Sequence, residues 1–117
     1  MLAFVTSLAL AACAPKAAPP PVALDCGQDF EILKAKVAAQ PGIVAAPKEA
    51  GEPYRAYSMP GRATSYFVTE PGAPAHPAIL MQQASAGQMT NTGCAYGDKT
   101  AYSELMAYLT SLKAGRK

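Results

Sequence analysis

The sequence predicts an α+β domain in which an antiparallel sheet of three to four strands is flanked by an N-terminal and a C-terminal helix. Two segments, one near residue 30 and one near residue 105, have apolar residues at helical spacing. Between them lie short runs rich in Tyr, Phe, Val and Thr, separated by Pro and Gly. Helices at both ends with short strands between them are typical of a two-layer domain around one core.

The first helix is expected over residues 25–40. Its apolar residues recur at intervals of three and four and would therefore lie on one face. These residues are Phe30, Leu33 and Val37. Asp25 is expected to be the N-cap, and Pro41 followed by Gly42 would end the helix.

The strands are expected between the two helices. Residues 54–59 and 64–69 are rich in aromatic and β-branched residues and are separated by a Pro-Gly-Arg sequence, which predicts a hairpin. Residues 78–83 begin with an apolar run without alternation, as in a strand that is covered on both faces. Residues 43–46 and 89–92 are weaker candidates for short strands.

The second helix is expected from Asp98, as its N-cap, to about Lys113. Apolar residues again recur at intervals of three and four along this segment. They are Tyr102, Leu105, Leu109 and Leu112. Residues 25–117 would thus form one small domain.

Charge and composition limit the classes of function. The formal net charge is +2, and the ten Lys and Arg residues are scattered, so no basic cluster could follow a phosphate backbone. We therefore expect no nucleic acid partner. The sequence also has no glycine-rich phosphate loop, no Ser-centred hydrolase motif and no set of zinc ligands, so no cofactor is expected.

The N-terminal segment carries the most specific motif. An uncharged apolar run over residues 2–10 is too short to span a bilayer and has the length of a signal-peptide core. It ends in Leu10-Ala11-Ala12-Cys13, which resembles the lipobox of bacterial lipoproteins. The resemblance implies that residues 1–12 are a signal peptide and that Cys13 is acylated through its sulfur.

The same resemblance implies a location. Several acyl chains on one residue anchor a protein to a membrane in effect permanently. Ala14 follows the cysteine, and lipoproteins of Gram-negative bacteria without aspartate at that position are generally sorted to the outer membrane. We therefore expect the periplasmic face of the outer membrane, with the Pro- and Ala-rich residues 13–24 as an extended tether.

An oxidising periplasm makes the two remaining cysteines a candidate disulfide. With Cys13 acylated, Cys26 and Cys94 are the available pair. The bridge would close a long loop, and chain entropy gives such a loop about 4 kcal/mol of stabilisation.

One loop and two tyrosines are candidates for contact with a partner. His76 is the only histidine and lies in residues 70–77, a loop that three prolines stiffen. Together with Tyr66 and Tyr96 it would form a recognition surface for an envelope protein or a cell-wall component, because tyrosine gives a large contact area at low entropy cost. The alternative is that all three side chains pack within the domain. Glu49 and Glu52 are expected to be solvated charges of a loop.

These observations favour a small non-enzymatic lipoprotein that is anchored through Cys13 and binds or supports another envelope component. Two alternatives remain open. In the first, Cys94 is the nucleophile and His76 the base of a thiol-dependent hydrolase or transferase of the cell envelope. In the second, residues 70–77 inhibit an envelope hydrolase, because a preordered loop binds at reduced entropic cost.

Overall fold

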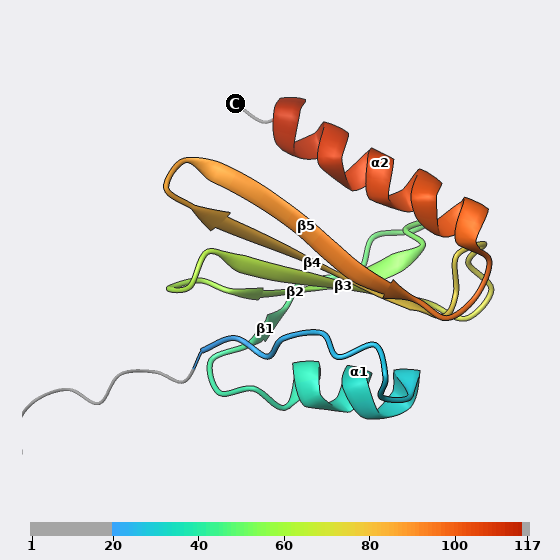
Figure 1. Cartoon of the computed structure of the whole chain (residues 1–117), viewed down its shortest axis with the longest axis horizontal. Coiled ribbons are helices and arrows are strands. Elements are labelled where there is room, and N and C mark those ends of the chain that lie inside the picture. The colour runs from blue at the N-terminus through green and yellow to red at the C-terminus, as the bar shows by residue number, and fades with distance from the viewer. Residues whose placement is uncertain (1–19, 116–117) are drawn as a thin grey trace, which may run out of the picture.

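The computed structural model describes residues 20–115 and the side chains as far as residue 111. Cys13, the predicted signal peptide and the tether as far as residue 19 lie outside the described residues. The described chain is an α+β domain with helix α1 (Phe30–Ala38), a five-stranded antiparallel sheet and helix α2 (Lys99–Gly115) (Figure 1). Neither helix in this part of the chain has the length and apolarity needed to cross a membrane.

The sheet is a meander in which each strand pairs with the next one along the chain. Its strands are β1 (Val44–Ala45), β2 (Tyr54–Met59), β3 (Thr64–Thr69), β4 (Ala78–Ser85) and β5 (Gln88–Ala95). The expectation of three to four strands is therefore corrected to five. Both weak candidates form strands, because β1 pairs with β2 over two residues and β5 pairs with β4 along its whole length.

The β4–β5 hairpin is longer than the sequence predicts. Pairing runs without a bulge from Ala78 opposite Ala95 to Ser85 opposite Gln88. Ala86 and the glycine after it have φ of 53° and 78°, and two positive φ values are typical of a two-residue turn that matches the twist of paired strands. The sequence signal is weak here because alanine rarely adopts this left-handed conformation.

The two helices pack on opposite faces of the sheet, so the domain has three layers rather than the expected two (Figure 1). On the α1 face, the core contains Phe30, Leu33, Val37, Met59, Tyr66, Val68, Ile79 and Met81. On the α2 face, it contains Tyr54, Ala75, Ala78, Leu80, Leu105 and Leu109. The first four residues of β4 are all buried, which explains why this strand has to be covered on both sides.

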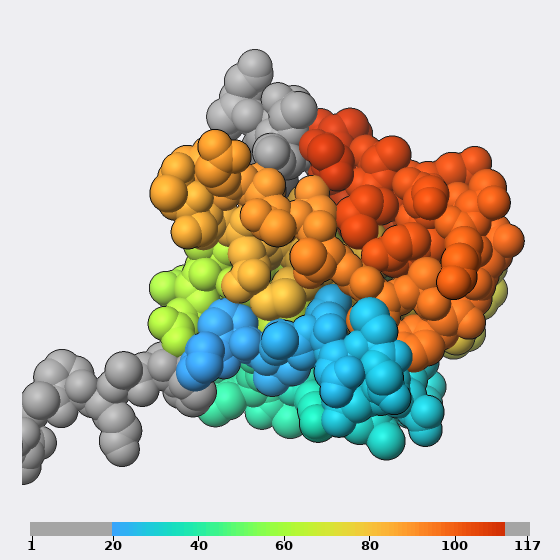
Figure 2. Space-filling view, in the orientation of Figure 1, coloured from blue at the N-terminus to red at the C-terminus, as the bar shows by residue number. Residues whose placement is uncertain are grey.

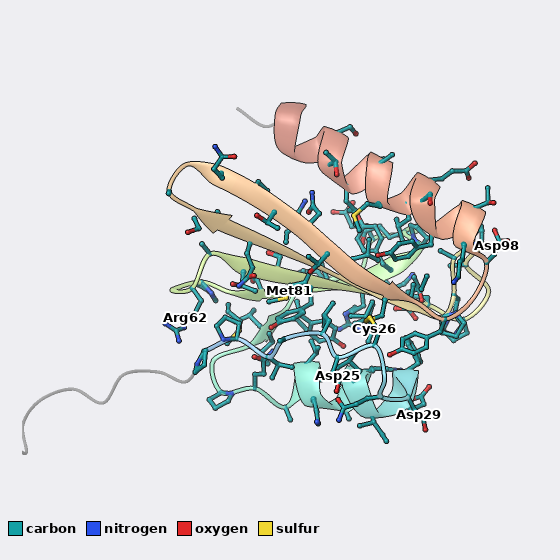
Figure 3. All side chains as sticks on the ribbon, viewed as in Figure 1. Asp25, Cys26, Asp29, Arg62, Met81 and Asp98 are labelled. Carbon is teal, nitrogen blue, oxygen red and sulfur yellow. A yellow bond between two sulfur atoms is a disulfide. The ribbon has the colours of Figure 1, made fainter. Side chains whose placement is uncertain are left out.

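The two helix starts differ in how well the sequence predicts them. Asp98 caps α2 as expected, since its Oδ2 accepts a hydrogen bond from the Ala101 backbone at 2.7 Å (Figure 3). Asp25 does not cap α1, because its Oδ1 accepts from the Gly27 backbone at 3.0 Å within a separate turn. Helix α1 consequently begins at Phe30, later than expected.

The predicted disulfide is confirmed. Cys26 and Cys94 are joined with an S–S distance of 2.00 Å across a sequence separation of 68. Figure 3 shows Cys26 in the segment that runs beside the sheet before α1 begins. The bridge therefore ties the start of the domain to β5, the last strand of the sheet.

Candidate functional site

Tyr66 is not part of a surface. Its side chain is 0% exposed on the α1 face, where its hydroxyl donates a hydrogen bond to the Val22 carbonyl oxygen at 2.7 Å. Gln40 Oε1 accepts from the Val22 backbone at 2.8 Å and completes the contact. The assignment of Tyr66 to a partner-binding surface is therefore corrected: the chain that precedes α1 covers this side chain.

His76 lies where its loop meets the sheet and is half-buried. Its Nδ1 is 2.9 Å from the Thr69 Oγ1 and 3.2 Å from the Thr69 carbonyl oxygen. The Thr69 hydroxyl also accepts from the Ala78 backbone at 2.9 Å and lies 3.2 Å from the Ala78 carbonyl oxygen, to which it donates. A hydroxyl has one proton, so this network assigns the Nδ1–H tautomer to His76. The imidazole thus fixes the loop to the sheet.

The rings of Tyr96 and His76 both pack against the ring of Phe30. The ring of Phe30 meets the His76 ring edge-on at 5.2 Å and the Tyr96 ring edge-on at 6.0 Å. The Tyr96 hydroxyl donates to the Gln28 carbonyl oxygen at 2.6 Å. The structure therefore brings together two of the three predicted partner residues, but Tyr96 uses its hydroxyl and His76 its Nδ1 within the domain.

The loop around His76 also packs closely against the link between β5 and α2. A Cβ atom at Gly97 would lie 2.5 Å from the His76 carbonyl oxygen, so only glycine fits at this position. Ala75, next to His76, is 4% exposed and belongs to the core on the α2 face. Residues 70–77 are consequently a wall of the domain that is packed from Ala75 to Pro77 and exposed at Pro71, Gly72 and Pro74.

That wall borders a cavity of about 430 Å³ on the α2 side of the sheet. The cavity lies between three parts of the chain: residues 50–54, residues 73–75 and the first half of α2. Most of its lining is apolar, with Pro74, Leu105 and Tyr108 among the lining residues. Its charged residues are Glu52 and Glu104, and no basic residue contributes to it in the part of the chain that the structure describes.

Tyr54 is the more buried of the two tyrosines that line this cavity. Its side chain is 5% exposed, and its ring packs edge-on against Phe67 at 5.2 Å. Burial raises the pKa of Tyr54, and the nearby Glu52, Tyr108 and Glu49 raise it further. Burial is the main cause of this shift, and the smaller part that comes from the carboxylates of Glu52 and Glu49 reflects a negative potential that would attract a cation.

The position of Glu52 is fixed by its own loop. Its Oε1 accepts a hydrogen bond from the Glu49 backbone at 3.2 Å, which holds the carboxylate beside the cavity. From α2 come Glu104 and Tyr108, four residues apart and therefore on one face of the helix. The spacing of Glu104 and Tyr108 is a signal in the sequence, but the pairing of this face with the loop at Glu52 depends on the fold.

The described residues give less support to a thiol nucleophile or a metal site. Cys94 is 2% exposed and bonded to Cys26, so it offers no thiol nucleophile. No group of three or more His, Cys, Asp and Glu side chains is placed to hold a metal ion between residues 20 and 115. Comparison of the chain with protein-family models, with curated proteins and with solved structures found no match.

Proposed function

We propose that this protein is a non-enzymatic, lipid-anchored component of the bacterial envelope that binds a partner protein through the cavity beside α2. The lipobox-like sequence that ends in Cys13 supports the anchor. The disulfide between Cys26 and Cys94 is in keeping with an oxidising compartment. The binding role rests on one observation, an apolar cavity whose charged residues, Glu52 and Glu104, are both acidic.

The chemistry of the cavity favours a cation on an apolar stem. An ammonium or guanidinium group would be attracted by the carboxylates of Glu52 and Glu104, whereas a carboxylate would be repelled. The half-exposed ring of Tyr108 offers a face for a cation–π contact, and Leu105 offers apolar surface to the stem. The partner is therefore a protein that inserts a lysine or arginine side chain.

The rigidity of the walls supports binding without large rearrangement. Pro53 and Pro74 both line the cavity, and His76 fixes the second of these loops through Thr69. A site whose shape is set before binding loses less conformational entropy on association. The packing of Ala75 and His76 within the domain favours a role as a cavity wall over that of an inhibitory loop.

Site-specific photo-crosslinking in cells tests the binding role. We place the photoreactive residue at Ala50 beside the cavity, or at Ala35 on α1 as a matched control, since both alanines are exposed. We expect an adduct from position 50 that disappears when Glu52→Gln and Glu104→Gln are combined. The same adduct from both positions, or an adduct that still forms in the double glutamine variant, would overturn the proposal.

The anchor has a separate test. The wild-type chain is expected in the membrane fraction, with the mass of acyl chains on the peptide that begins at Cys13. Cys13→Ala should release the protein into the soluble fraction, because no acyl chain can then be attached. A wild-type chain that carries no acyl mass at Cys13 contradicts the anchor but leaves the cavity as a binding site.

A further inference from the structure

The two edges of the sheet are protected to very different degrees. The edge at β1 consists of Val44 and Ala45 and is followed closely by Pro47, which cannot donate a backbone hydrogen bond. The edge at β5 has eight residues, Gln88–Ala95, that pair with β4 without interruption. Edge strands are usually shortened, bulged, charged or covered, because their free backbone groups can pair with another chain.

The β5 edge has few of these protections. No charged residue and no proline lies between Ala78 and Gly97. Within the described residues, the backbone of Gln88–Thr92 makes no hydrogen bond except those with β4, whereas the Gly93 carbonyl oxygen lies 3.6 Å from Cys26 Sγ. In Figure 2 the hairpin, in yellow to orange, reaches the surface between α2 in red and the N-terminal segment in blue. This edge is therefore available to a further strand.

We propose that β5 pairs in an antiparallel manner with β5 of a second copy of this chain, so that two sheets join into one. A strand that meets its own copy about a two-fold axis places identical side chains near one another, so any charge on it would repel its equivalent. This edge carries no charge to repel. Its exposed threonines, Thr90 and Thr92, suit such pairing because threonine is β-branched and threonine pairs form across strands.

The extent of pairing is limited by the disulfide. Cys26 is bonded to Cys94 and occupies the space beside the C-terminal end of β5. Pairing is therefore confined to residues 88–92, with the two-fold axis near Thr90. So short an interface falls well below the roughly 1,000 Å² typical of stable complexes, and we expect a dimer that dissociates on dilution.

A charge on the edge tests the proposal. The wild-type full chain should change from monomer to dimer as its concentration rises in sedimentation equilibrium. Thr90→Lys should raise the dimer dissociation constant by roughly tenfold or more, because it places two like charges beside the axis. Gln83→Lys is the matched control: Gln83 is exposed and is the direct pairing partner of Thr90, but it lies one strand in from the edge. This variant should dimerise as the wild type does.

Amide hydrogen exchange locates the contact. Protection at residues 88–92 should increase with protein concentration, while protection of Val44 and Ala45 on the other edge should not change. Circular dichroism confirms that Thr90→Lys remains folded. A wild-type chain that is monomeric at every concentration, an edge variant that dimerises normally, or increased protection elsewhere would overturn the self-pairing. None of these outcomes bears on the cavity at Glu52.

Discussion

The two faces of the sheet are built in different ways. The α1 face is tied to distant parts of the chain by the Cys26–Cys94 disulfide, by Tyr66 bonded to Val22 and by Tyr96 bonded to Gln28. The α2 face has a simpler apolar core and a cavity of about 430 Å³ bordered by carboxylates. The α1 face therefore supplies the covalent tie and two long-range hydrogen bonds of this small domain. Hollows of similar volume, about 430 and 420 Å³, open on the α2 face and beside the segment before α1, but among the described residues carboxylates border only the first.

The largest expected effect comes from removal of the disulfide. Replacing Cys26 and Cys94 together by alanine should lower the free energy of unfolding by about 4 kcal/mol, because the unfolded chain regains the entropy of a long loop. Urea unfolding followed by circular dichroism measures this. Cys13→Ala is the control and should leave the unfolding curve unchanged. A double variant as stable as the wild type would show that the α1 face does not depend on its covalent tie.

A smaller effect is expected from one hydroxyl on the same face. Tyr66→Phe keeps the buried ring but leaves the Val22 carbonyl oxygen without its donor, which should cost about 1–2 kcal/mol. Tyr57→Phe is the matched control, since Tyr57 is the direct pairing partner of Tyr66 across β2 and β3 and is only partly buried. The urea midpoints of the two variants compare their stabilities. Equal losses of stability in both variants would contradict a specific role for the Tyr66 hydroxyl.

Alkaline pH should affect both faces. Burial raises the pKa of Tyr66 and Tyr102. Burial also raises the pKa of Tyr54 and Tyr96, and nearby carboxylates raise it further by a smaller amount. The folded state then holds these protons more tightly than the unfolded state, whose tyrosines titrate near pH 10. The stabilisation is complete below that pH and is lost as the pH rises toward the folded pKa values.

Urea unfolding between pH 8 and pH 11 measures this loss of stability. Tyr54→Phe, on the α2 face, and Tyr66→Phe, on the α1 face, should each make the free energy of unfolding fall less steeply with pH. A background of Cys13→Ala prevents thiol exchange with the disulfide at high pH. A free energy of unfolding that stays constant through pH 11 would contradict the burial of these phenols.

The strands were easier to predict than the parts that position the site. The bounds of β2 and β3 follow from dense aromatic and β-branched residues between clear turn residues. β5 has mixed Thr, Asn and Gly, so only its pairing with β4 identifies its full length. Helix α1 begins later than the sequence predicts because Asp25 bonds within a turn, and local sequence does not distinguish that use from a helix cap.

The site itself required the fold. Glu52 and Glu104 are far apart in the chain, and the sequence gives no sign that a loop before β2 and a helix after β5 border one cavity. The sequence predicts that His76 lies in a loop between strands, but it does not reveal that its Nδ1 contacts Thr69 within the domain. The sequence leaves open whether Tyr66 is exposed or packed, because the residues of β3 do not reveal that both faces of this sheet are covered.

The affinity of the cavity for a cation tests the central claim most directly. We propose titrating the isotope-labelled full chain with hexylammonium and, as a probe of the same length and opposite charge, with hexanoate, while following backbone resonances by NMR. Hexylammonium should shift the resonances of Ala75, Ala101 and Leu105 with a dissociation constant of about 1 mM, as suits so small a ligand. Hexanoate should not.

Combining Glu52→Gln with Glu104→Gln should weaken hexylammonium binding roughly tenfold, because two nearby negative charges are lost. Glu31→Gln, on the exposed side of α1, is the control and should have no effect. Saturable binding that needs both glutamates is the result that the account predicts. Equal binding of hexanoate, shifts that fall outside the cavity, or unchanged affinity in the double glutamine variant would contradict it.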